Sequence, residues 1–387
     1  MTRALLVCPE PLGHKQPAGI GIRFLEMARV LRDDGHEVTL LSPDGAGITP
    51  ERIRDLTAAH DVAVVQGHIA NELFAHGRNL PTVVDLYDPF IIENLHYHAS
   101  RGPEVFAHDH ATLMLSLQRG DFFLCASDAQ RHFYLGALLA AGRLNPAAFE
   151  SDPTLQELIA VAPFGVPSPR ERAPRDTDAP RVLFGGIYDW YDPLLAVEAV
   201  AIARERLPRM TLTFNTHPNP ELTPQGKLAE ARRKAQDFVR FEPWVPYDDR
   251  AEYYDQFAVA LLTFPQSIET DLSMRTRVFD YLWGGLTIVS SSAPGTDEIL
   301  ERYGVGAVVR SEDAREIAEA LVYAVREEVS TRAFVEDYQW SHTLAPLREF
   351  VRAPHGTAGF SPPSSGLKVA APRRFLARLK RRMGGSS

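Results

Sequence analysis

The segment from Thr263 to Gly285 contains the residues best suited to bind a charged ligand. An apolar strand is expected to end at Phe264, and a polar loop then leads to a helix that starts near residue 273. Arg275 and Arg277 would lie in the first turn of that helix, where positive side chains oppose the helix dipole. The arrangement becomes favourable when an anion binds to the N–H groups and guanidinium forks together. The pattern therefore predicts a diphosphate site at these two arginines.

Acidic side chains lie on both sides of the two arginines. Asp280 falls nearly two helical turns beyond Ser273 on the same face, and its carboxylate can accept two hydroxyl hydrogens from a sugar ring. Glu269 and Asp271 lie in the loop before the helix. The alternative interpretation is a surface helix whose arginines pair with Glu269 and Asp271, because exposed ion pairs are common.

A second loop combines glycines with aromatic residues. It follows the strand expected over residues 181–184 and contains Gly185, Gly186 and Tyr188 before the helix-capping residue Asp192. Glycine allows another group to approach the backbone closely, and three aromatic residues are unusual in a plain loop. We therefore expect this loop to form one wall of a ligand site.

Two loops in the first half of the chain also carry polar groups. Gly19 and Gly21 open a helix, whose first N–H groups attract anions or polar ligands. A nicotinamide-cofactor site would need a third glycine where Phe24 stands. Asp85 and Asp88 follow a predicted strand, and ligands bind at such strand ends in open α/β sheets. The competing interpretation is that one of these carboxylates caps the turn.

No metal ion or cofactor is predicted. His96 and His98 are spaced like a metal pair, but no third ligand is evident. The Asp-Thr-Asp sequence at 176–178 lies in a proline-rich segment rather than at a strand end, so we expect it to be solvated. Cys8 and Cys125 are too few for a disulfide framework or a four-ligand zinc site.

The elements that must position these residues follow an α/β pattern. Short apolar runs alternate with longer amphipathic segments, as in a parallel sheet with helices on both faces. The chain of 387 residues is long enough for two such domains. We expect two tandem Rossmann-like, doubly wound domains. Strands are predicted at 4–8, 37–41, 62–66, 82–86, 122–126, 181–184, 211–215, 239–242, 259–264, 287–290 and 306–309, and helices at 21–34, 225–237, 248–257 and 274–284 and from 193 and 313.

Breaks in this pattern predict the domain boundaries. The expected parts are a first domain over 1–167, a linker over 168–180 and a second domain over 181–335. A C-terminal helix over 336–352 is expected to pack back on the first domain. Residues 353–387 have the composition of a flexible linker followed by a basic tail.

Residues 373–383 in that tail contain six basic and no acidic residues, with apolar side chains spaced to share one helix face. Such a segment can lie on an anionic membrane surface. A solvated basic tail is an equally good interpretation of the charge pattern.

Composition narrows the partners and the compartment. The chain has 41 basic and 50 acidic residues, for a net charge of −9, which argues against a general nucleic-acid binder. No run of about 18 apolar residues occurs, and the N-terminal apolar stretch is too short for a signal peptide. We therefore expect a cytoplasmic protein.

Taken in order, these motifs resemble the GT-B glycosyltransferases, and in particular a bacterial subgroup of the large retaining family 4. The resemblance covers about residues 3–350 and includes the two domains facing a cleft. It is carried by the Gly19–Gly21 opening, Asp85 to Pro89, residues 162–167, Trp244-Val245-Pro246 and the block from Glu269 to Gly285.

The resemblance implies roles for these residues. The donor nucleotide would bind to the second domain and the acceptor to the first, with Glu269 on hydroxyls of the transferred sugar. The family's usual Glu-x7-Glu is absent, since ten residues separate Glu269 from Asp280, and its diphosphate-binding Arg and Lys are missing from 187–193. Arg275 and Arg277 are expected to replace them. The implied catalytic residues are Asp88, Glu269, Arg275 and Arg277. The implied donor-binding residues are Gly185, Gly186, Tyr188 and Ser273, together with Trp244 and Val245 near the base and Asp280 at the ribose. The implied acceptor or phosphate loop contains Gly19, Gly21 and Asp85.

The implied reaction transfers a hexose from a nucleotide-sugar to a hydroxyl acceptor with retention of configuration and without a metal. The departing diphosphate would help to deprotonate the acceptor. The acceptor would belong to cell-surface glycan or glycoconjugate biosynthesis and could be lipid-linked, with the tail touching the inner membrane face. Two alternatives remain. One is a sugar-nucleotide epimerase of the same fold. The other is a catalytically silent binding subunit, which is compatible with the altered acid pair Glu269 and Asp280.

Overall fold

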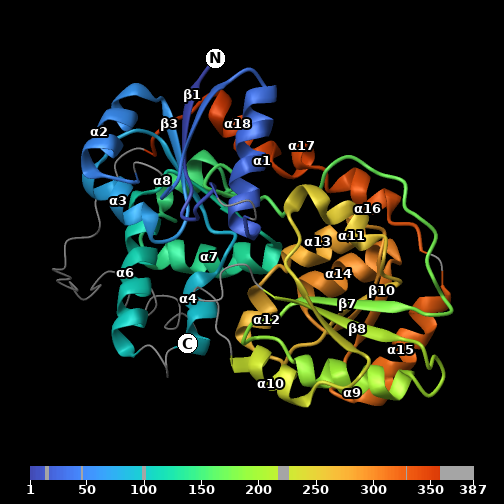
Figure 1. The fold of residues 1–387 in the computed structure, drawn as a ribbon. Helices are drawn as coiled ribbons and strands as arrows, with labels where there is room; N and C mark the ends of the chain where they lie inside the picture. The colour runs from blue at the N-terminus through green and yellow to red at the C-terminus, as the bar shows by residue number, and fades with distance from the viewer. Residues whose placement is uncertain (14–16, 45–46, 98–101, 217–225, 328, 358–387) are drawn as a thin grey trace, which may run out of the picture. The chain divides into compact units, whose positions relative to one another are not determined.

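A computed structural model describes residues 1–13, 17–44, 47–97, 102–216, 226–327 and 329–357 of the chain (Figure 1). Residues 1–357 form one compact unit. Its two halves each contain a six-stranded parallel sheet with flanking helices. The predicted fold class, two tandem doubly wound α/β domains, is confirmed.

The first sheet has the strand order β2-β1-β3-β4-β5-β6. Apart from the exposed Arg3 at the start of β1, its central strands are buried, as expected when helices cover both faces of a parallel sheet. The strands are β1 (Arg3–Val7), β2 (Glu37–Leu41), β3 (Val62–Val65), β4 (Thr82–Asp85), β5 (Phe122–Cys125) and β6 (Ile159–Val161). The helices are α1 (Gly19–Asp33), α2 (Pro50–Ala59), α3 (Ile69–His76), α4 (Phe90–Glu93), η1 (Asn94–Tyr97), α6 (Pro103–Arg119), α7 (Asp128–Ala140) and α8 (Pro146–Ser151).

The second sheet has the order β12-β11-β10-β7-β8-β9. Its strands are β7 (Arg181–Gly186), β8 (Thr211–Thr216), β9 (Val239–Pro243), β10 (Val259–Leu262), β11 (Thr287–Ser291) and β12 (Gly306–Val309). The helices beside it are α9 (Pro193–Ala203), α10 (Gly226–Lys234), η2 (Tyr247–Asp249), α11 (Arg250–Tyr254), α12 (Ile268–Leu272), α13 (Thr276–Trp283), α14 (Pro294–Tyr303) and α15 (Ala314–Arg326).

Each sheet has a topological switch point at which ligands bind in such folds. In the first sheet, β1 has β2 on one side and β3 on the other. In the second sheet, β7 has β8 on one side and β10 on the other. The loops after β1 and β7 are therefore the expected ligand loops.

The C-terminal segment returns to the first half. Three short helices replace the single helix expected over 336–352: α16 (Arg332–Asp337), α17 (Trp340–Thr343) and α18 (Ala345–Arg352). The Phe350 ring of α18 stacks on Phe122 of β5 at 4.9 Å, and Arg348 forms an ion pair with Asp34 at 2.5 Å. Figure 1 shows the red α18 among the blue elements of the first half.

Two of the short elements that were not predicted lie at the sheet edge and beside the arginine-bearing segment. Strand β6 has only three residues and extends the edge of the first sheet. Helix α12 lies in the segment predicted to be a polar loop, where the Ser267 side chain accepts a hydrogen bond from Thr270 N and so caps it.

The predicted tail at 373–383 and His98 lie outside the described residues. Within the described part, no helix is both long and apolar enough to cross a membrane.

Candidate active site

A cavity of about 290 Å³ is lined by loops from both halves of the compact unit. The first half contributes the loops after β1 and β4, and the second half contributes the loop after β7, the segment after β9 and the start of α13. Most of the predicted site residues line it: Gly19, Asp88, Gly185, Gly186, Tyr188, Trp244, Val245, Ser273, Arg275, Arg277 and Asp280. Gly21, Asp85 and Glu269 do not.

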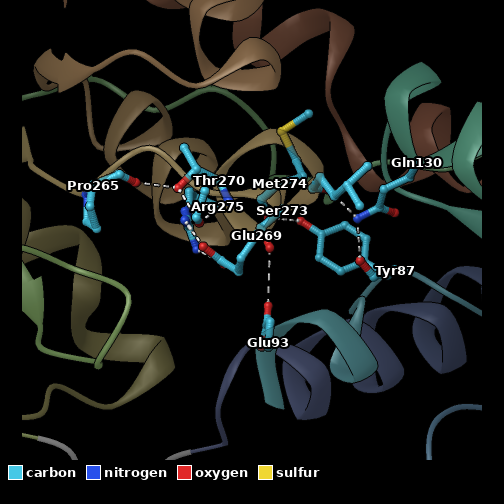
Figure 2. Close-up of polar contacts among 11 residues, drawn as sticks. Tyr87, Glu93, Gln130, Pro265, Glu269, Thr270, Ser273, Met274 and Arg275 are labelled. Atoms are coloured by element: carbon cyan, nitrogen blue, oxygen red, sulfur yellow. Dashed lines mark hydrogen bonds and ion pairs between the residues drawn. The ribbon is translucent and has the colours of Figure 1, made fainter. Parts of the chain in front are cut away.

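Arg275 is paired inside the protein. Its two terminal nitrogens lie 2.5 and 2.6 Å from the two carboxylate oxygens of Glu269, and the residues are only 5% and 1% exposed (Figure 2). Helix α13 begins at Thr276, not near Ser273 as expected, so Arg275 is its N-cap residue. The alternative interpretation was a surface helix whose arginines pair with Glu269 and Asp271. Arg275 does pair with Glu269, but the pair is buried rather than on the surface. The charge of Arg275 is therefore largely neutralised before any ligand binds.

Arg277 positions the glycine loop. Its Nη1 donates to the carbonyl oxygens of Phe184 at 3.0 Å and Gly186 at 2.9 Å, and the Tyr281 hydroxyl also donates to Phe184 O. Gly185 has a φ of +82°, and a side chain there would collide with the Tyr281 hydroxyl. Among the ion pairs of the described residues, none involves Arg277, so its positive charge remains beside the cavity.

Asp280 and Arg250 form a second charged pair in the cavity wall. The Nε of Arg250 lies 3.2 Å from Oδ1 of Asp280. Burial raises the pKa of Asp280, and the positive charge of Arg250 opposes this rise. Arg250 carries no sequence signal, because an arginine that starts a short helix after β9 belongs to no motif.

Three carboxyl groups line the first-half wall of the cavity: Glu10, Asp88 and Glu93. Burial raises the pKa of Glu10 and of Asp88 to about 6. Burial and the nearby charge of Asp88 raise the pKa of Glu93 well above its usual value. Glu93 also accepts a hydrogen bond from Ser273 Oγ at 3.4 Å. Glu10 had no sequence signal, because it lies apart from the glycines that it meets in the fold.

Two residues of the expected acceptor or phosphate loop, Gly21 and Asp85, already have partners within the protein. The Gly21 N–H donates to Glu10 Oε2 at 2.9 Å, so a carboxylate of the chain already occupies that anion-binding position. Asp85 is 1% exposed and forms a two-point ion pair with Arg23 at 2.7 and 3.2 Å. Arg23 also donates to the carbonyl oxygens of Ala162 and Pro163, so Asp85 holds segments of the first half together.

An aromatic wall lies beside the glycine loop. The Tyr188 and Trp190 rings stack at 4.9 Å, and the Trp190 ring also meets the edge of Tyr97 at 6.3 Å. A Cβ added to Gly186 would lie 3.2 Å from the Trp244 ring, so the ring and the backbone are in close contact. This wall offers flat surfaces for a planar ligand group.

Side chains of the first half also hold the connection between α12 and α13. The Tyr87 hydroxyl donates to Met274 O at 3.0 Å (Figure 2). Gln130, which is fully buried, donates to Leu272 O at 2.8 Å and to Tyr87 O at 3.0 Å. The segment that carries Arg275 is thus fixed from the first half.

Among the described residues, no group of three or more His, Cys, Asp or Glu side chains is arranged to hold a metal ion. Asp176 and Asp178 are exposed, and Asp176 accepts hydrogen bonds from the backbone of the same turn.

Solved structures of GT-B glycosyltransferases share this fold. Anabaena HepE in complex with UDP and glucose aligns over 91% of this chain and 100% of its own, at 14% identity and a TM-score of 0.62. HepE in complex with UDP-glucose aligns over the same shares at 13% identity and a TM-score of 0.63. Sucrose-phosphate synthase from Thermosynechococcus elongatus aligns over 100% of both chains, at 14% identity and a TM-score of 0.55. The chain therefore has the GT-B fold.

The second half is also similar to a sequence family. Residues 179–327 match the family described as "Glycosyl transferases group 1". The matched segment runs from β7 through α15, so the part of the chain that is similar to this family supplies the second-half wall of the cavity. No curated protein sequence matches the chain significantly.

Proposed function

We propose that the protein transfers a sugar from a nucleotide-sugar donor to a hydroxyl acceptor. The observation that carries this proposal is that the matched group 1 segment supplies Gly185, Gly186, Trp244 and Asp280 to one cavity, while the first half supplies its opposite wall. HepE, which shares the fold, was solved with UDP-glucose, and this supports the same class of donor.

In this proposal the donor binds to the second-half wall. Trp244 and Val245 contact the base, Asp280 binds the ribose, and Tyr188 and Ser273 complete the wall. The diphosphate lies near the Gly185–Gly186 backbone.

The two arginines then have different tasks. Arg277 has carbonyl partners, and its charge faces the diphosphate, whereas Arg275 is neutralised by Glu269 and positions the start of α13. Positioning and fixed charges are the contributions that such a transfer requires.

The acceptor binds beside Asp88 on the first-half wall, near Gly19. The acceptor oxygen bonds to the anomeric carbon as the bond from that carbon to the diphosphate oxygen breaks. The acceptor proton passes to the departing diphosphate on the same face, so configuration is retained. Asp88 orients the acceptor hydroxyl, because a group with a pKa of about 6 is ionised at neutral pH. The proposed reaction includes no metal ion.

The proposed setting is cell-surface glycan or glycoconjugate biosynthesis on the cytoplasmic side of a membrane. A lipid-linked acceptor would bring the enzyme to that surface, and the six basic residues of 373–383 would favour anionic lipid there.

A catalytically silent binding subunit is the second candidate. It is favoured by the burial of Glu269, because the carboxyl group that the resemblance assigns to sugar hydroxyls is paired with Arg275 and does not line the cavity.

The test begins with thermal unfolding of the full chain against a panel of nucleotide sugars, because a ligand that binds only the native state raises the melting temperature. Each stabilising donor is then assayed for release of nucleoside diphosphate, with and without hydroxyl acceptors, and the anomeric configuration of the product is read by NMR. Trp244→Ala should abolish the stabilisation. Tyr323→Ala removes a 63% exposed ring from the same half and should not. Binding without turnover would favour the silent subunit, and the absence of binding by any donor would exclude both candidates.

A further inference from the structure

Arg250 is buried in the cavity wall, and two of its nitrogens lack a hydrogen-bond partner. It is 6% exposed, and its guanidinium carbon lies 3.5 Å from the Tyr247 ring centre and 4.4 Å from that of Trp283. Its Nη1 donates to Tyr247 O at 2.6 Å, but Nε and Nη2 have no hydrogen-bond partner. Buried donors without acceptors are rare and costly, so a ligand that supplies the acceptor is expected.

Asp280 offers the complementary group at the same position. Its Oδ1 forms an ion pair with Nε of Arg250 at 3.2 Å, but the contact does not meet hydrogen-bond geometry, and Oδ1 has no other hydrogen-bond partner. The carboxylate is 16% exposed and lines the same cavity. The cavity wall thus presents a guanidinium that needs an acceptor beside a carboxylate that needs a donor.

The chemistry of this pair selects its ligand. A phosphate only accepts hydrogen bonds, so it could satisfy Arg250 but would be repelled by Asp280. Two neighbouring hydroxyl groups can accept from the guanidinium and donate to the carboxylate at once. A ribose carries such a diol, and a 2′-deoxyribose does not.

We propose that Arg250 is a specificity residue of the donor site, which binds the ribose diol together with Asp280 and selects ribonucleotides over 2′-deoxyribonucleotides. The inference rests on the proposed function and extends it, because the resemblance assigned the ribose to Asp280 alone. Loss of the 2′-hydroxyl leaves one member of the pair without its hydrogen bond, and sites built to bind a hydroxyl reject analogues that lack it.

The test compares nucleoside diphosphates that differ only in the 2′-hydroxyl: UDP with dUDP, GDP with dGDP and ADP with dADP. Isothermal titration of the full chain should show, for the base that binds, a ribonucleotide preference of about tenfold or more. Arg250→Met should weaken ribonucleotide binding and reduce the preference to within about twofold, because a single hydrogen bond to a charged group accounts for the difference. Asp280→Asn should also reduce the preference, and it carries the test if Arg250→Met does not fold.

Arg204→Met is the matched control. The Arg204 guanidinium lies 4.9 Å from the Phe238 ring centre and donates to Met210 O at 2.6 Å, in the same half but outside the cavity. This variant should retain the full preference. Equal binding of both sugars by the natural chain, or an unchanged preference in Arg250→Met, would overturn this inference alone. If no nucleotide binds, the proposed function and this inference both fail.

Discussion

At the scale of single residues, the site depends on which charges are already paired. Arg275 and Arg277 are two positions apart, yet one meets a buried carboxylate and the other meets carbonyl oxygens. Only the second keeps a net positive charge beside the cavity. The same motif therefore contains one structural arginine and one that can act on an anionic ligand.

Arg275→Met should lower the free energy of unfolding by about 3–5 kcal/mol, because it leaves the Glu269 carboxylate buried without a partner. Urea unfolding followed by circular dichroism would measure the loss. Arg332→Met is the control, since Arg332 pairs with Glu336 on the surface and its loss should cost less than about 1 kcal/mol. Equal losses in the two variants would show that the buried pair does not stabilise the protein.

The raised pKa values of Glu10 and Asp88 predict a pH dependence. The folded protein holds protons on these carboxyl groups up to about pH 6, whereas the unfolded chain releases them near pH 4. The folded state then binds more protons, so the contribution of these groups to stability falls as pH rises from about 4 to 6 and stays low above that range.

Melting temperatures of the natural chain and of Glu10→Gln/Asp88→Asn, measured at pH 5 and pH 7.5, test this dependence. The double variant should gain stability relative to the natural chain at pH 7.5. The reverse trend would mean that the folded protein favours the charged forms.

At the scale of elements, the connection between α12 and α13 illustrates how much a sequence pattern reveals. The pattern predicted a ligand site in this segment, and residues 273–277 line the cavity, but the five-residue α12 was predicted as a loop. So short a helix has little intrinsic stability, and contacts from elsewhere must hold it. Gln130 and Tyr87 of the first half supply such contacts at the backbone of residues 272–274.

Gln130→Leu should therefore destabilise the protein by about 1–3 kcal/mol, because the carbonyl oxygens of Leu272 and Tyr87 and the N–H of Ala126 lose buried hydrogen-bond partners. It should also weaken donor binding by displacing the start of α13. Unfolding and titration measurements would detect the two effects. Gln118→Leu, on the exposed face of α6, should leave both unchanged. Unchanged donor binding in Gln130→Leu would mean that the connection is held without this side chain.

At the scale of the whole molecule, the basic segment at 373–383 is expected to bind the protein to a membrane surface. We predict that the full chain sediments with vesicles that contain phosphatidylserine but not with pure phosphatidylcholine. Each basic residue near an anionic surface contributes about 1 kcal/mol, so binding should weaken strongly as salt is raised.

Replacing Arg378, Lys380, Arg381 and Arg382 by glutamine should abolish that sedimentation, whereas replacing Arg310, Arg315, Arg326 and Arg332 of the compact unit should not. If both variants bind like the natural chain, the tail is a solvated segment instead.

The sequence by itself determined the two parallel α/β sheets, because the spacing of apolar residues reports directly on buried strands and amphipathic helices. It also located the glycine loops and the arginine-bearing block, since these depend on local chain geometry. Only the tertiary structure decided which charges meet. Glu10 reaches Gly21, Arg23 pairs with Asp85, and Arg250 lies against Asp280. Such pairings join residues that are 11 to 62 positions apart, and their strength depends on burial. No local pattern carries that information.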